Sequence, residues 1–200
     1  MQILGASTPL IPAVLSSYSV KGSSYDQRFL SYAFLVISGS LLLTISAKVQ
    51  IPFYPVPITM QSFVVLMIGM SYGAPLAAST VLLYLFQGLI GLPVFASGAG
   101  IAYMTGPTGG YLAGFFLSAI LLGIMASNGW GRNWKTTALA MITGIGIIFL
   151  SGVSWLSTFI GVEAALMSGF FPFIFGDFLK IIIASLAMPA AWSVVDRILK

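Results

Sequence analysis

Asp177 and Lys180 are the two residues of this chain whose type and spacing most clearly indicate chemistry. They lie three positions apart in an otherwise apolar run, so a helix would place both on one face. A charge inside a membrane-spanning helix costs roughly 2.5–3.5 kcal/mol, so such a pair is expected to face a bundle interior. A neighbouring carboxylate and ammonium suit a ligand group with both N–H and C=O, such as a urea or amide. An internal ion pair that only locks the last helix is the alternative.

Polar and aromatic side chains elsewhere in the chain could complete a binding site with this pair. The candidates are Gln61, Gln87, Tyr84, Tyr103, Phe53 and Tyr54. Buried amides need hydrogen-bond partners, which either a ligand or a neighbouring helix would supply to the two glutamines. Phe53 and Tyr54 could close over an apolar ligand, although single aromatic residues in membrane proteins are more often interfacial.

The residue types that are missing argue against catalysis. The chain has no histidine and no cysteine, which excludes Ser-His and Cys-His nucleophiles and thiolate metal ligands. Only four acidic residues occur, and Asp26 and Asp196 lie near opposite ends of the chain. There is also no G-x-x-x-x-G-K-[ST] phosphate loop. We therefore expect no enzyme, no metal and no cofactor, and any ATP-driven transport would need another chain.

The elements that must position these side chains are membrane helices. Apolar residues make up 58% of the 200 and charged residues 6%, against about 25% charged in soluble domains. No Asp, Glu, Lys or Arg occurs at positions 49–131 or 136–162. A span needs roughly 20 apolar residues, so the first run alone can hold three. The net charge of +4 is scattered between apolar segments, which does not suit nucleic acid.

Six spans are predicted, at 29–47, 58–72, 74–92, 108–127, 136–161 and 173–197. This is an all-α membrane protein, with residues 29–200 as one six-helix transmembrane substrate-binding domain. Residues 1–28 carry no clear secretory signal and are expected to be a poorly ordered cytoplasmic lead. The basic residues set the orientation: Lys21, Arg28, Arg132, Lys135, Arg197 and Lys200 fall on one side and only Lys48 on the other. This bias predicts that both termini lie in the cytoplasm.

Two connections on the predicted outer side, at 51–57 and 93–107, contain no charged residue. Pro52, Pro55 and Pro57 exclude a helix from the first, and glycines punctuate the second, at 93–107. Irregular backbone near membrane depth is tolerated where protein buries it or where it lines a cavity. The two loops are therefore expected to form a lid over a pocket, with ordinary interhelical turns as the alternative.

Small residues recur every four positions in two stretches of the chain. They are Gly69, Gly73 and Ala77, then Gly106, Gly110, Gly114 and Ser118. Such spacing lets helix backbones approach closely in lipid. Packing within the bundle is the simpler interpretation, and a docking face for a partner membrane subunit is the alternative.

Four motifs in order resemble those of a known family. They are PVPITMQ at 55–61, GLIGLPVF at 88–95, GPTGGYL at 106–112 and GDFLK at 176–180. Together they look like the BioY family, the biotin-capture subunits, or S-components, of energy-coupling factor (ECF) transporters. Each motif alone is weak, whereas the combination over about residues 51–180 is specific.

The resemblance implies a six-helix S-component in a bacterial inner membrane, with biotin bound near the outer face. By position in the motifs, Asp177 and Lys180 would bind the polar rings of biotin, and Gln61 would also lie at the site. The implied partners are a transmembrane coupling subunit and ATPase subunits. Lys48, Tyr103, Thr105 or backbone N–H groups are left for the biotin carboxylate. The alternatives are a proton-coupled secondary carrier and a structural membrane protein.

Overall fold

Long helices make up most of the chain. The computed structural model describes residues 8–18 and 25–198. Within them, each expected span corresponds to one helix: α2 (Tyr25–Lys48), α3 (Gln61–Tyr72), α4 (Ala74–Leu89), α6 (Gly109–Ser127), α7 (Trp134–Ile160) and α9 (Phe171–Ile198). By length and composition, α2, α6, α7 and α9 can cross a membrane. Helices α3 and α4 have 12 and 16 residues. At 1.5 Å per residue they reach only about 18 and 24 Å, less than a ~30 Å hydrocarbon core.

Short elements connect the long helices: α1 (Leu10–Tyr18), β1 (Gln50–Ile51), β2 (Ile58–Thr59), α5 (Gly100–Met104), the 3₁₀ turn η1 (Trp130–Arg132) and α8 (Val162–Gly169). The proline-rich connection is non-helical as predicted, because β1 and β2 pair antiparallel across it. Residues 58–60 were expected to begin the second span, but 58 and 59 form β2 instead. Helix α8 was not expected, and Gly161, with φ 81°, separates it from α7.

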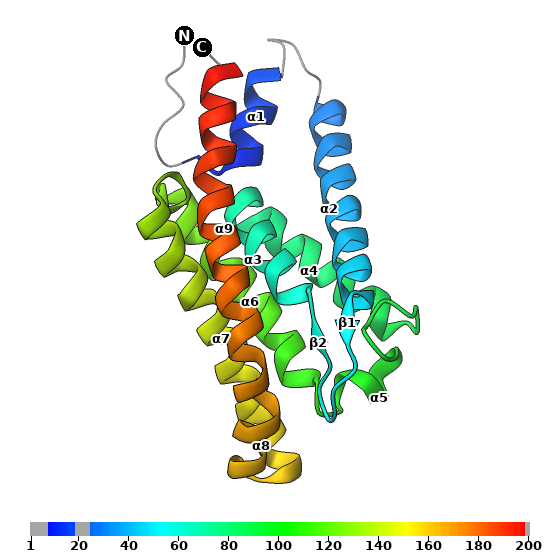
Figure 1. The fold of residues 1–200 in the computed structure, drawn as a ribbon. Coiled ribbons are helices and arrows are strands. Elements are labelled where there is room, and N and C mark those ends of the chain that lie inside the picture. The colour runs from blue at the N-terminus through cyan, green and yellow to red at the C-terminus, as the bar shows by residue number, and fades with distance from the viewer. Residues whose placement is uncertain (1–7, 19–24, 199–200) are drawn as a thin grey trace.

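Helix α6 lies at the centre of the bundle and packs against α3, α4 and α7, while α9 covers α3 and α7 and α2 lies on α4 (Figure 1). Close approach between α6 and α7 depends on small residues. A Cβ on Gly110 would overlap Trp155, and one on Gly114 would lie 2.9 Å from the Ile148 Cα. For these two glycines the predicted packing role inside the bundle is confirmed.

Helix α1 falls inside the segment for which a poorly ordered lead was expected. It is packed against α3 and α9, with Leu10 and Ala13 buried in the core and the Pro9 ring against Gly73. Pro12 falls in the first turn of the helix, where a missing N–H breaks no intrahelical bond. The apolar side chains of this segment therefore find a partner surface at the turn between α3 and α4. The sequence pattern of residues 10–18 alone could not show this.

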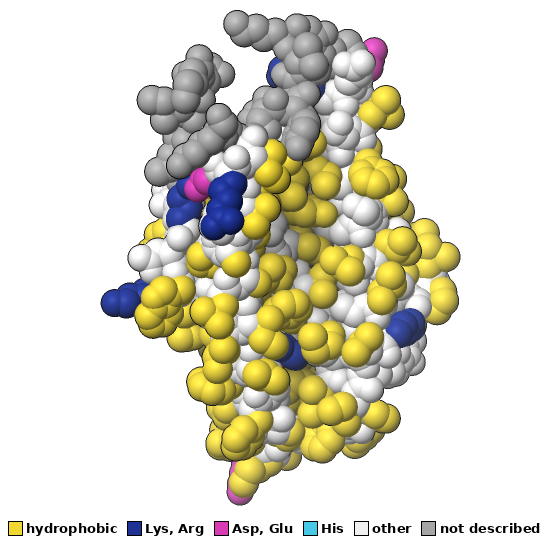
Figure 2. All heavy atoms as spheres, turned by 45° about the horizontal axis from the view of Figure 1, so that its top comes forward, with side chains coloured by type: hydrophobic (Ala, Val, Ile, Leu, Met, Phe, Trp, Pro, Cys, Tyr) yellow, Lys and Arg dark blue, Asp and Glu magenta, His cyan; other side chains and the backbone are white. Residues whose placement is uncertain are grey.

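Apolar side chains cover much of the outer surface, and charged side chains gather mainly toward one end (Figure 2). At that end Arg132 binds Asp196 at 3.1 Å and lies 3.8 Å from the centre of the Trp192 ring. Lys21 and Lys200, two of the basic residues used for the orientation, lie outside the described residues. The β1–β2 pair and α5 lie at the opposite end from α1 (Figure 1).

Candidate binding site

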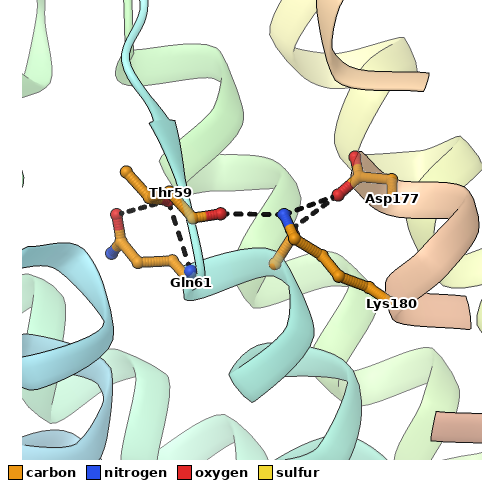
Figure 3. A network of polar contacts seen from close by, with 5 residues as sticks. Thr59, Gln61, Asp177 and Lys180 are labelled. Carbon is orange, nitrogen blue, oxygen red and sulfur yellow. Dashed lines mark hydrogen bonds and ion pairs between the residues drawn. The ribbon is translucent and has the colours of Figure 1, made fainter. Parts of the chain in front are cut away.

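The two charged residues predicted from the sequence form a buried ion pair on α9. Lys180 Nζ lies 2.8 Å from Asp177 Oδ1, and the side chains are 9% and 7% exposed. Their three-residue spacing on the helix brings them together, and both project toward β2 and the beginning of α3 (Figure 3). The carboxylate lies at the first turn of α3, where the helix dipole favours negative charge.

Every donor of the Lys180 ammonium is engaged by the protein. Its three N–H groups donate to Asp177 Oδ1, to Ser62 Oγ at 2.9 Å and to Thr59 O at 2.8 Å. Lys180 therefore cannot donate to a ligand without giving up one of these bonds. It holds Asp177 against β2 and α3.

The two oxygens of the Asp177 carboxylate are in different surroundings. Oδ1 accepts from Lys180 and from Ser62 Oγ at 3.0 Å. Oδ2 makes no hydrogen bond to any residue that the structure describes. Asp177 also lines a cavity, and Oδ2 is the carboxylate oxygen that keeps its acceptor capacity.

This cavity lies beside β2 and α5, which contribute Thr59 and Tyr103 to its lining. The space between its lining residues is about 490 Å³ when the open mouth is counted. Asp177 is the one charged residue among those that line it, which are Val56, Pro57, Thr59, Gln61, Ser62, Ala96, Tyr103, Thr108, Tyr111, Leu112, Phe115, Ile148, Phe149, Phe173 and Asp177. Most of the wall is apolar or aromatic, with a few polar groups on one side.

Gln61 brings an amide to the same cavity. Its Nε2 donates to the Tyr84 hydroxyl at 2.6 Å, and that hydroxyl donates to Val94 O at 3.2 Å. One N–H of the amide has no partner in the described chain. Among the described residues, its Oε1 accepts one long hydrogen bond, from Thr59 Oγ1 at 3.4 Å. Tyr84 itself is fully buried and does not line the cavity, which it meets only through its hydrogen bond to Gln61.

Aromatic rings form the apolar wall. Tyr111 and Phe173 stack with ring centres 6.3 Å apart, and Phe149 meets Phe173 edge-on at 6.1 Å. The Tyr111 hydroxyl donates to Gly169 O at 2.7 Å, which fixes the ring. Tyr103 lies on α5, and burial raises the pKa of its phenol, so it stays neutral at physiological pH.

Several residues proposed from the sequence are placed away from the cavity lining. Gln87 accepts from Ser40 Oγ at 2.5 Å and so links α4 to α2. Phe53 and Tyr54, in the β1–β2 connection, are 41% and 90% exposed. Thr105 Oγ1 donates to the carbonyl of its own helical turn, at Ile101. Lys48 Nζ donates to a backbone carbonyl, at Phe95, in the second outer connection.

Other cavity residues were not identified from the sequence. Ser62 could have been predicted, because it is a polar residue next to Gln61 in an otherwise apolar helix. Phe173 lies four positions before Asp177 and so shares its face of α9. Thr59 acts at the pair through its backbone carbonyl, and Phe149 is one of many apolar residues on α7, so neither has a signal in the sequence. Among the described residues, no three acidic side chains gather into a group that could hold a metal ion.

Comparison with known proteins gives one consistent result. The model of the BioY family matches residues 21–197. The "Probable biotin transporter BioY" of Rickettsia prowazekii is 34% identical over 151 residues, which are 75% of this chain and 77% of that protein. The "Biotin transporter BioY" of Thermotoga maritima is 36% identical over 147 residues, 72% of this chain and 86% of that protein.

A solved structure has the same fold. The chain matches the crystal structure of "the S-component for biotin from an ECF-type ABC transporter" with a TM-score of 0.71 and 25% identity. The match covers 86% of this chain and 95% of that one. Helix α1 lies before the region that the family model matches.

Proposed function

The chain belongs to the BioY family, and on that premise we propose that it is a biotin-binding S-component that takes up biotin with an ATP-driven ECF module. The single observation that carries the assignment of the site is the Asp177 carboxylate. Asp177 lines an aromatic-walled cavity, and its Oδ2 has no hydrogen-bond partner among the described residues. Biotin offers a ureido ring with N–H and C=O groups, an apolar bicycle and tail, and one carboxylate.

In this proposal the ureido group meets the polar side of the cavity. A ureido N–H donates to Asp177 Oδ2, and the ureido oxygen accepts from the free N–H of Gln61. Lys180 acts through Asp177, because its three donors already hold the carboxylate in place. This differs from direct contact of Lys180 with biotin, which the motif alone suggests.

The apolar part of biotin is proposed to lie against the ring wall. Tyr111, Phe149 and Phe173 supply one side, and Tyr103 on α5 supplies the other. Phe53 and Tyr54 remain proposed as residues of the outer loop that approach once the ligand is bound. For the biotin carboxylate, the described cavity lining offers hydroxyl groups, at Tyr103 and Thr108, and no cation.

The proposed setting is a bacterial inner membrane, crossed by six helices with both ends of the chain in the cytoplasm. Helices α3 and α4 would be the two short spans, and residues 1–28 would lie on the cytoplasmic side. The cavity would then face outward, because β2 and α5, which contribute Thr59 and Tyr103 to its lining, lie toward the end opposite α1 (Figure 1). A transmembrane coupling subunit and ATPase subunits would supply the driving force.

An uptake assay tests this function. Cells that cannot make biotin and lack a biotin transporter would express the chain alone, with its coupling module, or with a module whose ATPase is inactive. We expect uptake of limiting biotin with the active module and none for Asp177→Ala, although that variant still inserts in the membrane. If the chain alone takes up biotin, and this uptake stops when the proton gradient is dissipated, the chain would instead be a secondary carrier. Folded protein that neither binds nor takes up biotin would indicate a structural role.

A further inference from the structure

Three consecutive backbone carbonyls of the second outer connection are each bound by a side chain from a different element. Tyr84 on α4 donates to Val94 O at 3.2 Å. Lys48 at the end of α2 donates to Phe95 O at 2.5 Å, and Gln50 on β1 donates to Ala96 O at 3.2 Å. Residues 94–96 belong to no helix or strand, so these carbonyls have no partner from regular structure.

The Phe95 ring connects this segment to the cavity. It is fully buried, stacks on Tyr103 with centres 5.0 Å apart and meets Tyr84 edge-on at 5.4 Å. A Cβ on Gly88 would overlap this ring, so α4 is shaped to receive it. Tyr103 and Ala96 both line the cavity, so the position of residues 94–96 sets the position of one cavity wall.

Lys48 is the one charged donor of the three. No carboxylate lies within ion-pair distance of its ammonium among the described residues, so the Phe95 carbonyl is the polar group that it contacts. A hydrogen bond from a charged donor is roughly twice as strong as a neutral one. The Gln50 amide also carries a desolvation cost, because its oxygen is buried without a partner in the described chain.

We infer that Lys48 is a positioning residue for the ligand cavity. Its hydrogen bond holds residues 94–96 in place as the outer wall of that cavity. Tyr84 connects the 94–96 segment to the cavity lining, since its hydroxyl donates to Val94 O and accepts from the Gln61 amide. Lys48 acts from behind the wall and does not touch the ligand. Only the ligand measurement below rests on the proposed biotin binding.

The absence of cysteine from the chain permits a direct test without ligand. Ala96→Cys places one thiol in the wall, at a side chain that is 7% exposed, and its alkylation by N-ethylmaleimide reports opening of the segment. We expect Lys48→Met to raise the alkylation rate roughly tenfold, as loss of one charged hydrogen bond predicts. Lys48→Arg should restore the slow rate. Lys135→Met, at an exposed lysine on α7, should leave it unchanged.

Two results would overturn the inference. One is an unchanged alkylation rate at Ala96→Cys in the Lys48→Met background. The other is an equal rise at a second reporter, Ala140→Cys in the buried core of α7, which would mean global loosening.

Biotin kinetics supply the readout at the site. Lys48→Met should speed biotin dissociation roughly tenfold, and Lys48→Arg should restore slow dissociation. An unchanged dissociation rate would show that the wall does not retain the ligand, against the inference. If the unmodified protein binds no biotin, the proposed function fails, while the alkylation experiment still decides whether Lys48 holds the wall.

Discussion

Replacing the Asp177 carboxylate by an amide should weaken biotin binding strongly without removing the cavity. Asp177→Asn keeps the shape of the side chain and removes the charge that the ligand N–H would meet. A hydrogen bond to a charged group contributes about 1.5–3 kcal/mol. Since 1.4 kcal/mol is tenfold in affinity, the expected loss is roughly 10- to 150-fold. Titration calorimetry of detergent-purified protein measures it.

The same substitution should also destabilise the fold, because Lys180 is left charged in the interior. Both side chains of the pair are less than a tenth exposed, so solvent screening is small. Breaking a buried pair costs about 3–5 kcal/mol. Lys180 keeps its bonds to Thr59 O and Ser62 Oγ, which places the expected cost near the lower value. Thermal unfolding in detergent measures the change.

A double variant separates ligand contact from structural support. Asp177→Asn combined with Lys180→Met removes both charges, so its unfolding temperature should recover toward that of the parent. Biotin affinity should stay low, because the carboxylate is still missing. Recovery of near-parental affinity in the double variant would refute the role of Asp177 as the ligand contact, and so would unchanged affinity in Asp177→Asn alone.

Further substitutions probe other parts of the cavity and the bundle. Phe173→Ala removes part of the ring wall, and biotin affinity should fall roughly tenfold by calorimetry; full affinity would exclude this ring from the site. Gln87→Leu removes a bond between α4 and α2 only, so affinity should stay within about threefold while stability falls by about 1 kcal/mol; a large loss of affinity would mean that Gln87 reaches the ligand. Gly110→Leu should destabilise the bundle by about 3 kcal/mol through overlap with α7. Gly146→Leu should not destabilise it, because a Cβ at that position would have no atom within 4 Å. Equal unfolding temperatures for these two variants would contradict the packing of α6 on α7.

Features set by local sequence could be predicted. Asp177 and Lys180 pair because a helix brings residues three apart together, and no tertiary information is needed. The long apolar runs locate the helices, and the prolines at 52, 55 and 57 exclude a helix between α2 and α3. The resemblance to the BioY family is confirmed by the family model over residues 21–197.

Features set by tertiary contacts could not be predicted. Two of the three acceptors of Lys180 are Thr59 and Ser62, more than a hundred positions earlier in the chain. Residue type and helix context do not distinguish Gln61 from Gln87, because both are amides in apolar helices; only the motif resemblance singles out Gln61. Packing turns Gln61 toward the cavity and Gln87 toward α2. Helix α1 was missed because its partner surface, at Gly73, exists only once α3 and α4 have folded.

The most direct test of the central claim compares biotin with an analogue methylated at both ureido nitrogens. Both would be titrated by calorimetry into the purified protein, prepared from cells grown without biotin. We expect saturable binding of one biotin per chain and at least tenfold weaker binding of the analogue, which cannot donate to Asp177. Equal affinity for the two ligands, or no heat from biotin with fully folded protein, would contradict recognition of the ureido group in this cavity.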